Sequence, residues 1–205
     1  MIALERDGGV WTATIAREEK AGALGAAMLT RLAEIAEEAG RNETARLLIL
    51  TGSGKVFSAG ADLGEMTSGL ATAPEWERLS AAIAALPCLS IAALNGTVAG
   101  GAIGMVLACD FRVAVPGAQV FYPVMQRGFL PQPSDPARLA ALVGPARARR
   151  MLLAGERVDA QTALDWGLFD RIAAPEDLRA AALGLADHAL AATPAHVAAI
   201  KRLCP

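Results

Sequence analysis

The alternation of hydrophobic and polar positions predicts strands early in the chain and mostly helices later. Residues 10–15 alternate apolar and polar side chains, as a half-buried strand does. The runs 46–51 and 89–94 are almost continuously apolar, which is typical of buried strands. Strands are predicted at 10–15, 46–51, 89–94, 111–115, 119–122 and 169–172.

Helices are predicted where apolar residues return every three or four positions and where glycine or proline marks an end. In the segment 24–39, Leu24, Met28 and Leu32 share one face, and Gly40 follows as a stop. The predicted helices are 24–39, 74–86, 101–108, 137–143, 145–153, 160–166, 175–191 and 194–203, and the predicted loops are 64–73 and 123–136. This order indicates one α/β domain over residues 1–205 with a helical C-terminal part.

Two turns rich in glycine and alanine each follow a predicted buried strand. They are Phe57-Ser58-Ala59-Gly60-Ala61-Asp62-Leu63 and Asn95-Gly96-Thr97-Val98-Ala99-Gly100-Gly101-Ala102. Small residues let main-chain N–H groups come close to a ligand. Two such donors aimed at one point form an oxyanion hole, which stabilises negative charge on a carbonyl oxygen. We therefore interpret the two turns as the centre of an active site.

Composition and charge exclude several other classes of protein. The chain has 205 residues, of which 54% are hydrophobic, so it can fill a core. Its net charge of −2 gives no broad attraction to nucleic acid. Cys88, Cys109 and Cys204 lack metal or redox spacing, so we expect reduced thiols in a cytoplasmic protein. The uncharged, apolar stretch 88–108 is long enough for a membrane-spanning helix, but its glycine turn divides it into pieces that are too short to cross a bilayer. We therefore expect no membrane partner.

Other patterns with catalytic meaning are incomplete. Gly52-Ser53-Gly54-Lys55 is similar to a phosphate-binding loop, but the upstream glycine is missing and Val56 follows the lysine. The only histidines, His188 and His196, stand on predicted alanine-rich helices, and a general base needs a placed partner. We expect neither a Ser-His-Asp enzyme nor a metal site.

The two turns, together with their spacing, resemble the crotonase (enoyl-CoA hydratase/isomerase) superfamily. Further segments that resemble family landmarks follow in order along the chain. They are 5–10 (opening strand), 17–24 (the entry before the first helix), 95–110 (the second turn and its helix), 142–148 and 166–172. The resemblance covers nearly the whole chain, and several separate motifs in order are far more specific than any one of them.

The resemblance implies a spiral of ββα units that assembles as a homotrimer or a dimer of trimers. It also implies an acyl-CoA or acyl-pantetheine thioester as ligand, with CoA as part of the substrate and no separate cofactor. Ala59 and Gly101 match the two positions whose N–H groups hold the thioester oxygen. The substrate-binding residues predicted in this way are Ala59, Gly60, Ala61, Asp62 and Gly101.

The chain departs from the family at the positions of the two glutamates that hydratases use. Gly104 and Val124 match these positions, and neither residue can transfer a proton. Isomerase- or decarboxylase-type chemistry through an enolate is therefore favoured over standard hydration. Gln132 matches an aspartate of dienoyl-CoA isomerases and aromatic dehalogenases, and it is a candidate for orienting water or substrate.

Other polar residues near these motifs have both a functional and a structural interpretation. Tyr122, Gln126, Arg127 and Asp135 belong to the same loop region as Gln132 and can serve the site. Asp62 matches a family residue that supports the turn and the backbone around the ligand. Glu65, just beyond it, is expected to be solvated rather than catalytic.

Two alternatives to an acyl-CoA enzyme stay open. A catalytically silent homologue that binds CoA esters, or serves as an assembly subunit, fits the missing glutamates. An enzyme acting on carrier-protein thioesters would keep the same oxyanion hole. The chain also stops earlier than family members usually do, so a C-terminal tail shorter than usual is expected.

Overall fold

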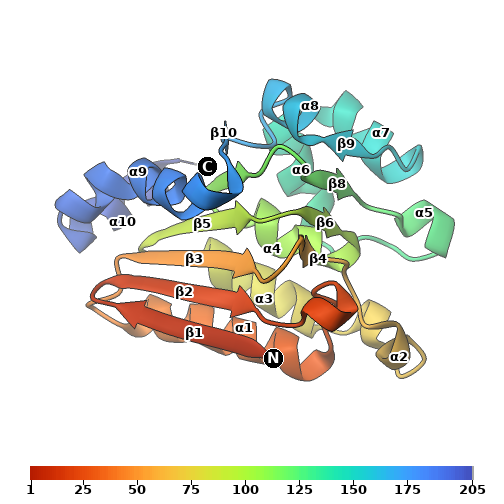
Figure 1. Ribbon diagram of the computed structural model, residues 1–205, viewed down its shortest axis with the longest axis horizontal. Helices are drawn as coiled ribbons and strands as arrows, with labels where there is room; N and C mark the ends of the chain where they lie inside the picture. The colour runs from red at the N-terminus through yellow and green to blue at the C-terminus, as the bar shows by residue number, and fades with distance from the viewer. Residues whose placement is uncertain (205) are drawn as a thin grey trace.

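Six strands form the larger of two sheets in the computed structural model, which describes residues 1–204 (Figure 1). In spatial order they are β1 (Ile2–Asp7), β2 (Val10–Ile15), β3 (Leu47–Gly52), β5 (Leu89–Leu94), β7 (Phe111–Ala114) and β10 (Arg171–Ile172). β1 pairs with β2 as an antiparallel hairpin, and every other pair in this sheet is parallel. Parallel strands require crossover connections, which here run through helices and through the second sheet.

The second sheet is built from four short strands. They are β4 (Val56–Ser58), β6 (Thr97–Ala99), β8 (Gln119–Phe121) and β9 (Val158–Asp159). β4, β6 and β8 run parallel, and β9 is antiparallel to β8. Each of the three parallel strands follows a strand of the larger sheet along the chain, so β3-β4, β5-β6 and β7-β8 form three successive units, each followed by a helix.

Helices fill the connections and the later part of the chain. The α-helices are α1 (Ala26–Arg41), α2 (Leu63–Met66), α3 (Glu75–Ala84), α4 (Ile103–Leu107), α5 (Val124–Arg127), α6 (Asp135–Val143), α7 (Pro145–Leu153), α8 (Ala160–Asp165), α9 (Leu178–Ala191) and α10 (Pro194–Leu203). Short 3-10 helices lie at η1 (Glu18–Lys20), η2 (Leu70–Thr72), η3 (Gly100–Ala102) and η4 (Pro175–Asp177). The α/β class and the helical C-terminal part predicted from the sequence are confirmed.

The core lies on both faces of the central strands. Every residue of β5 is buried, as are the first four residues of β3, which explains their continuous apolar runs. In Figure 1, α1 and α3 lie behind the larger sheet, whereas α9 lies in front of it. α9 packs against β3, β5 and β7, and α1 packs against α3. The sheet is therefore covered by helices on both sides, as parallel sheets are in α/β proteins.

The predictions hold for β2, β3, β5, β7 and β8. The opening strand assigned to 5–10 instead lies at 2–7, the segment 169–172 contains only the two residues of β10, and both predicted loops contain helices. The segment 64–73 includes most of α2 and all of η2, and the segment 123–136 includes α5 and the start of α6. Single-turn helices have too few residues to show a hydrophobic period, so pattern analysis misses them. The same argument applies to β4 and β6, which have three residues each and were not predicted.

The apolar stretch 88–108 is interior structure rather than a long helix. It contains β5, β6, η3 and α4, nearly all of whose residues are buried. Within residues 1–204, no helix combines the length and apolar character that crossing a bilayer requires.

We expect Gly96→Ala to destabilise the fold. A Cβ at this position would lie 2.0 Å from the carbonyl oxygen of Lys55, so one of the two backbones must shift. Overpacking of this kind costs about 1–3 kcal/mol of unfolding free energy, which urea denaturation measures. Gly117→Ala is the matched control, because no atom lies within 4 Å of its Cβ position. Equal stability of the two variants would contradict this expectation.

Candidate active site

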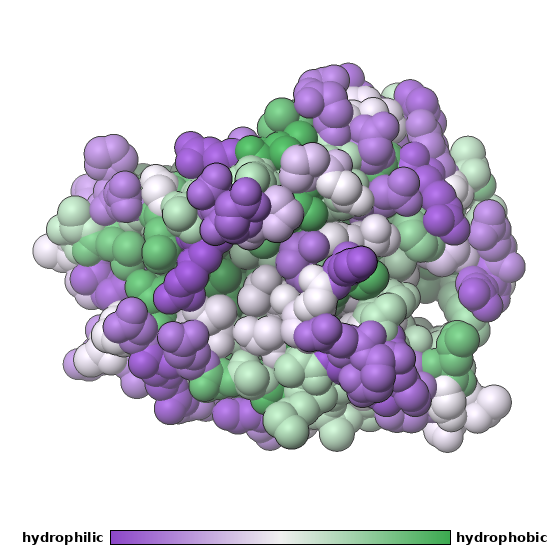
Figure 2. Space-filling view, viewed as in Figure 1, coloured by the Kyte–Doolittle hydropathy of each residue, from purple (hydrophilic) through white to green (hydrophobic). Residues whose placement is uncertain are grey.

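The two glycine turns line one cavity of about 660 Å³. β4 leads into the turn containing Ala59 and Ala61, and the neighbouring strand β6 leads into Gly100 and Gly101. Because β4 and β6 are parallel neighbours, their carboxyl ends meet at one edge, which is where open α/β sheets bind ligands. Figure 2 shows the surface hollowed on the right of the view, between the positions of α2 and α5 in Figure 1.

The turns touch each other closely at Gly60. This residue has φ +94°, a conformation that favours glycine, and a Cβ there would lie 2.8 Å from the carbonyl oxygen of Ala99. Gly101 is also confined, though less tightly, since a Cβ on it would lie 3.1 Å from the indole of Trp76. Glycine at these positions therefore allows the two backbones and the indole to pack around one point.

The hydrogen bonds of the first turn show that Ala59, the residue predicted to donate its N–H to the ligand, already donates it to the protein. The N–H of Ala59 donates to the carbonyl of Ala21 at 2.9 Å, and the N–H of Gly60 donates to Ser58 Oγ at 3.2 Å. The N–H of Asp62 donates to the carbonyl of Leu24 at 2.9 Å. The prediction that Ala59 supplies a ligand donor is wrong, because its N–H already has a protein acceptor.

In the described part of the chain, the N–H of Ala61 has no protein acceptor, unlike those of Ala59, Gly60 and Asp62. Within residues 1–204, neither the Ala61 N–H nor the Gly101 N–H donates to a protein acceptor. Both residues line the cavity. Buried or enclosed N–H groups are almost always paired, so two unpaired donors on one cavity wall indicate a place for a ligand oxygen.

Asp62 holds the first turn in place. Its carboxylate is 2.5 Å from Arg17 Nη2 and 3.0 Å from Lys20 Nζ, and it accepts a hydrogen bond from the N–H of Gly64 at 2.8 Å. The Lys20 and Gly64 bonds, together with Arg17, lower the pKa of Asp62 to about 2. Asp62 is therefore a fixed anion that caps α2, and Lys20 shares the cavity wall with it.

Glu65 has a structural task at the start of α1. Its Oε2 accepts a hydrogen bond from the N–H of Ala26 at 2.9 Å. A Cβ on Gly25 would lie 2.1 Å from Glu65 Oε1, so glycine is needed for this contact. Helix N-termini favour a carboxylate, which satisfies an otherwise unpaired N–H and the helix dipole. Glu65 is therefore a structural residue rather than a simply solvated one, and it does not line the cavity.

The loop residues predicted to face the substrate divide into two groups. Tyr122, Arg127 and Gln132 line the cavity, as does Val124, whereas Gln126 does not. Asp135 lies behind them, 1% exposed, with its Oδ2 accepting a hydrogen bond from the Tyr122 hydroxyl at 2.8 Å. The Tyr122 hydroxyl oxygen also accepts from the N–H of Gln132 at 3.3 Å. Sequence reasoning named these residues separately, but it did not predict their connection.

Three cations stand around the cavity. Lys20, Arg127 and Arg157 all line it, and the Arg157 guanidinium lies 4.0 Å from the centre of the Phe121 ring. Arg157 was missed by sequence reasoning, because only the tertiary fold brings it beside β8. Lys201 is not near this site, since its Nζ bonds to Asp110 Oδ2 at 2.6 Å. Both histidines are exposed on helices remote from the cavity.

The comparison with known families agrees with this architecture. The family model for enoyl-CoA hydratase/isomerase matches residues 5–204. The chain belongs to this family. The crotonase superfamily membership that the two turns indicated is confirmed.

Members of the enoyl-CoA hydratase/isomerase family resemble the chain in sequence and in structure. The probable enoyl-CoA hydratase echA6 of Mycobacterium leprae is 35% identical over 187 residues, covering 88% of this chain and 74% of the relative. The solved enoyl-CoA hydratase of Bacillus anthracis has a TM-score of 0.90 at 29% identity, covering 98% of this chain and 81% of that one. DspI of Pseudomonas aeruginosa has a TM-score of 0.91 at 34% identity, covering 99% and 79%. The predicted crotonase-like fold is confirmed.

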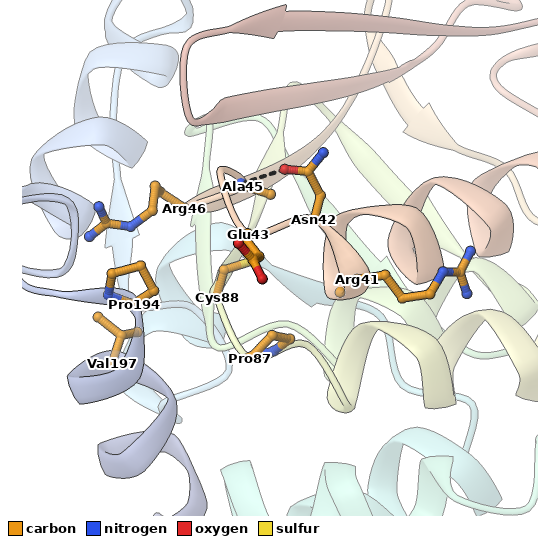
Figure 3. A pocket seen from close by; sticks show the side chains of 10 residues that line it. Arg41, Asn42, Glu43, Ala45, Arg46, Pro87, Cys88, Pro194 and Val197 are labelled. Atoms are coloured by element: carbon orange, nitrogen blue, oxygen red, sulfur yellow. Dashed lines mark hydrogen bonds between the residues drawn. The ribbon is translucent and has the colours of Figure 1, made fainter.

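A second cavity lies at the other end of the central strands and does not fit this family chemistry. It has a volume of about 170 Å³ and lies near the starts of β3 and β5, beside α10 (Figure 3). Arg46, which lines it, donates to the carbonyls of Ala189 and Ala192 at the end of α9. The Arg46 guanidinium is thus occupied in holding the C-terminal end of α9. The part of the chain that the structure describes contains no cluster of potential metal ligands.

We expect Asp62→Asn to lower stability in a pH-dependent manner. The pKa of Asp62 falls from 3.8 to about 2 on folding, so its contribution is present above pH 4 and is lost as pH falls towards 2. Asn cannot pair with Arg17 and Lys20, so the variant should unfold at lower denaturant concentration at pH 7. The difference from the wild type should shrink as pH falls from about 4 to about 2. A difference independent of pH would show that the charge of Asp62 is not responsible.

Proposed function

We propose that this chain is an enzyme that binds an acyl-CoA thioester and stabilises its enolate with the N–H groups of Ala61 and Gly101. The observation that carries this proposal is the pair of unpaired N–H groups on the two touching turns of one cavity. A thioester oxygen placed between them gains two hydrogen bonds, and these strengthen as negative charge develops on it. Family membership makes acyl-CoA the expected ligand class.

The surroundings of the two donors suit the two ends of such a ligand. Hydrophobic side chains that can receive an acyl group line the cavity, among them Met66, Trp76 and Val124. Lys20, Arg127 and Arg157 are available for the phosphates of CoA, which is part of the substrate, so no separate cofactor is proposed. A pantetheine thioester without the nucleotide would use the same donors but not these cations.

The reaction proposed is isomerisation or decarboxylation rather than standard hydration. Hydration needs titrating groups that place and activate water, and Gly104 and Val124 offer none at the positions matched to the hydratase glutamates. Loss of CO₂ from a substrate produces the enolate without proton abstraction, so the two donors and polar groups such as Gln132 can suffice. Gln132 is neutral and is proposed to orient substrate or water.

The remaining expectations from the family resemblance belong to the same proposal. We expect a homotrimer or a dimer of trimers acting in the cytoplasm. Size-exclusion chromatography with light scattering measures the subunit number directly.

The second candidate function is a silent homologue that binds CoA esters without turning them over. It is favoured by Gly104 and Val124, which cannot transfer protons. It predicts thioester binding without any product, whereas the enzyme predicts new acyl species. Mass spectrometry after incubation with enoyl-, malonyl- and methylmalonyl-CoA separates the two.

We expect calorimetric titration to show tighter binding of butyryl-CoA than of free CoA. Two net hydrogen bonds contribute about 0.5–1.5 kcal/mol each, which corresponds to a preference of roughly 5- to 150-fold. Equal binding of the two ligands would contradict the proposed oxyanion hole.

Ala61→Pro tests the newly assigned donor. Proline removes the Ala61 N–H, whereas the bonds that fix this segment use the Gly60 carbonyl and the Asp62 N–H. The preference for butyryl-CoA over CoA should fall by roughly 2- to 12-fold, the loss expected for one hydrogen bond of about 0.5–1.5 kcal/mol. Ala61→Gly is the matched control, because it keeps the N–H. A preference unchanged in Ala61→Pro, with the fold intact by circular dichroism, would remove Ala61 from the site.

A further inference from the structure

A buried carboxyl group lies directly behind the cavity wall. Asp135 begins α6 and is 1% exposed, and its Oδ1 has no hydrogen-bond partner within residues 1–204. Burial of an aspartate with one unsatisfied oxygen is costly, because desolvation penalises the charged form. Such a group is retained where its titration or its position has a use.

The unsatisfied oxygen occupies the space above Gly104. A Cβ at position 104 would lie 2.8 Å from Asp135 Oδ1 and 2.9 Å from Ser80 Oγ. Gly104 stands in the first turn of α4, which directly follows η3 and Gly101. The carboxyl of Asp135 therefore lies where a side chain from position 104 would otherwise project, one turn from the Gly101 donor.

Tyr122 connects this carboxyl to the cavity. The tyrosine lines the cavity, and its hydroxyl donates to Asp135 Oδ2 at 2.8 Å. Asp135 itself does not line the cavity. Tyr122 is therefore the residue that links the Asp135 carboxyl to the cavity by a hydrogen bond.

The charges that face Asp135 come from α3 and α6. Glu77 on α3 raises the pKa of Asp135, whereas Arg138 on α6 and the Tyr122 hydroxyl lower it. Glu77 is held by Ser134, whose Oγ donates to Glu77 Oε1 at 2.5 Å. The residue of α4 that lies next to the Asp135 carboxyl is Gly104, which carries no charge. Burial is the largest influence, and it raises the pKa of Asp135 to about 6.

We infer that Asp135, acting through the hydroxyl of Tyr122 that it positions, moves a proton between the α-carbon of the bound thioester and the protein. This inference rests on the proposed function, because the thioester must first be held by Ala61 and Gly101. Tyr122 is the group that contacts the substrate, and Asp135 is a positioning residue and proton reservoir. The pair supplies a titrating function that Gly104 and Val124 lack.

The proton transfer balances without any further reactant. The phenolic oxygen of Tyr122 takes a proton from the α-carbon while its own proton passes to Oδ2 of the Asp135 carboxylate. The electron pair of the broken C–H bond moves into the enolate, whose oxygen accepts from the Ala61 and Gly101 N–H groups. Because the two transfers occur together, no free phenolate forms. The reverse transfer returns a proton to carbon.

The test is exchange of the α-protons of butyryl-CoA with deuterium in D₂O, followed by NMR. The wild type should exchange these protons, and the rate should rise with pH and level off above a midpoint near 6, because Asp135 must be ionised to accept a proton. Asp135→Asn and Tyr122→Phe should each slow exchange by about 10²-fold or more. Asp135→Asn should also remove the pH midpoint, which a purely structural role would leave in place. Both variants should still bind butyryl-CoA more tightly than CoA.

Asp187→Asn is the matched control, since this aspartate is exposed on α9, remote from the cavity. Its exchange rate should equal that of the wild type. Failure of the wild type to prefer butyryl-CoA over CoA would overturn the proposed function. The inference about Asp135 alone would be overturned if the wild type binds the thioester but does not exchange its α-protons. It would also be overturned if folded Asp135→Asn exchanges them as fast as the wild type does. Circular dichroism shows whether each variant is folded. The pH profile of exchange by the wild type tests the inference even if a variant fails to fold.

Discussion

The parallel pairing of β4 with β6 is the constraint on which the site depends. Both strands have only three residues, yet their pairing brings the Ala61 turn against the Gly101 turn. A Cβ on Gly60 would meet the Ala99 carbonyl oxygen at 2.8 Å, so the turns meet at the limit that glycine allows. Main-chain N–H groups placed in this way suit the proposed oxyanion hole, because preorganised donors stabilise a developing negative charge.

The fold places Asp62 and Asp135, two carboxyl groups near the cavity, in different surroundings. Asp62 is paired with Arg17 and Lys20 and remains an anion, because paired cations lower its pKa. Asp135 is buried, and this burial raises its pKa more than Arg138 and the Tyr122 hydroxyl lower it. Two carboxyl groups of the same type therefore have opposite tasks, one fixing a turn and the other able to titrate near neutral pH.

Much of the fold was predictable because its signals are local. The buried runs of β3 and β5 and the period of α1 follow from side chains close together in the sequence. The one-turn helices α2 and α5 were not predictable, since so few residues carry no period. The roles of Ala59 and Glu65 were wrong for another reason. The Ala21 carbonyl that accepts from Ala59 and the Ala26 N–H that donates to Glu65 come from segments far away in the sequence, and no local pattern identifies such partners.

The sequence by itself determined the α/β class, the family, the two glycine turns and the absence of a titrating side chain at Gly104 and Val124. These follow from residue type and spacing, which are fixed before folding. Only the tertiary structure decided that Ala61 rather than Ala59 has the unpaired N–H, and that Asp135 meets Tyr122 above Gly104. The physical reason is that pairing and desolvation depend on which distant groups pack together, and these arise only when the chain closes around its core.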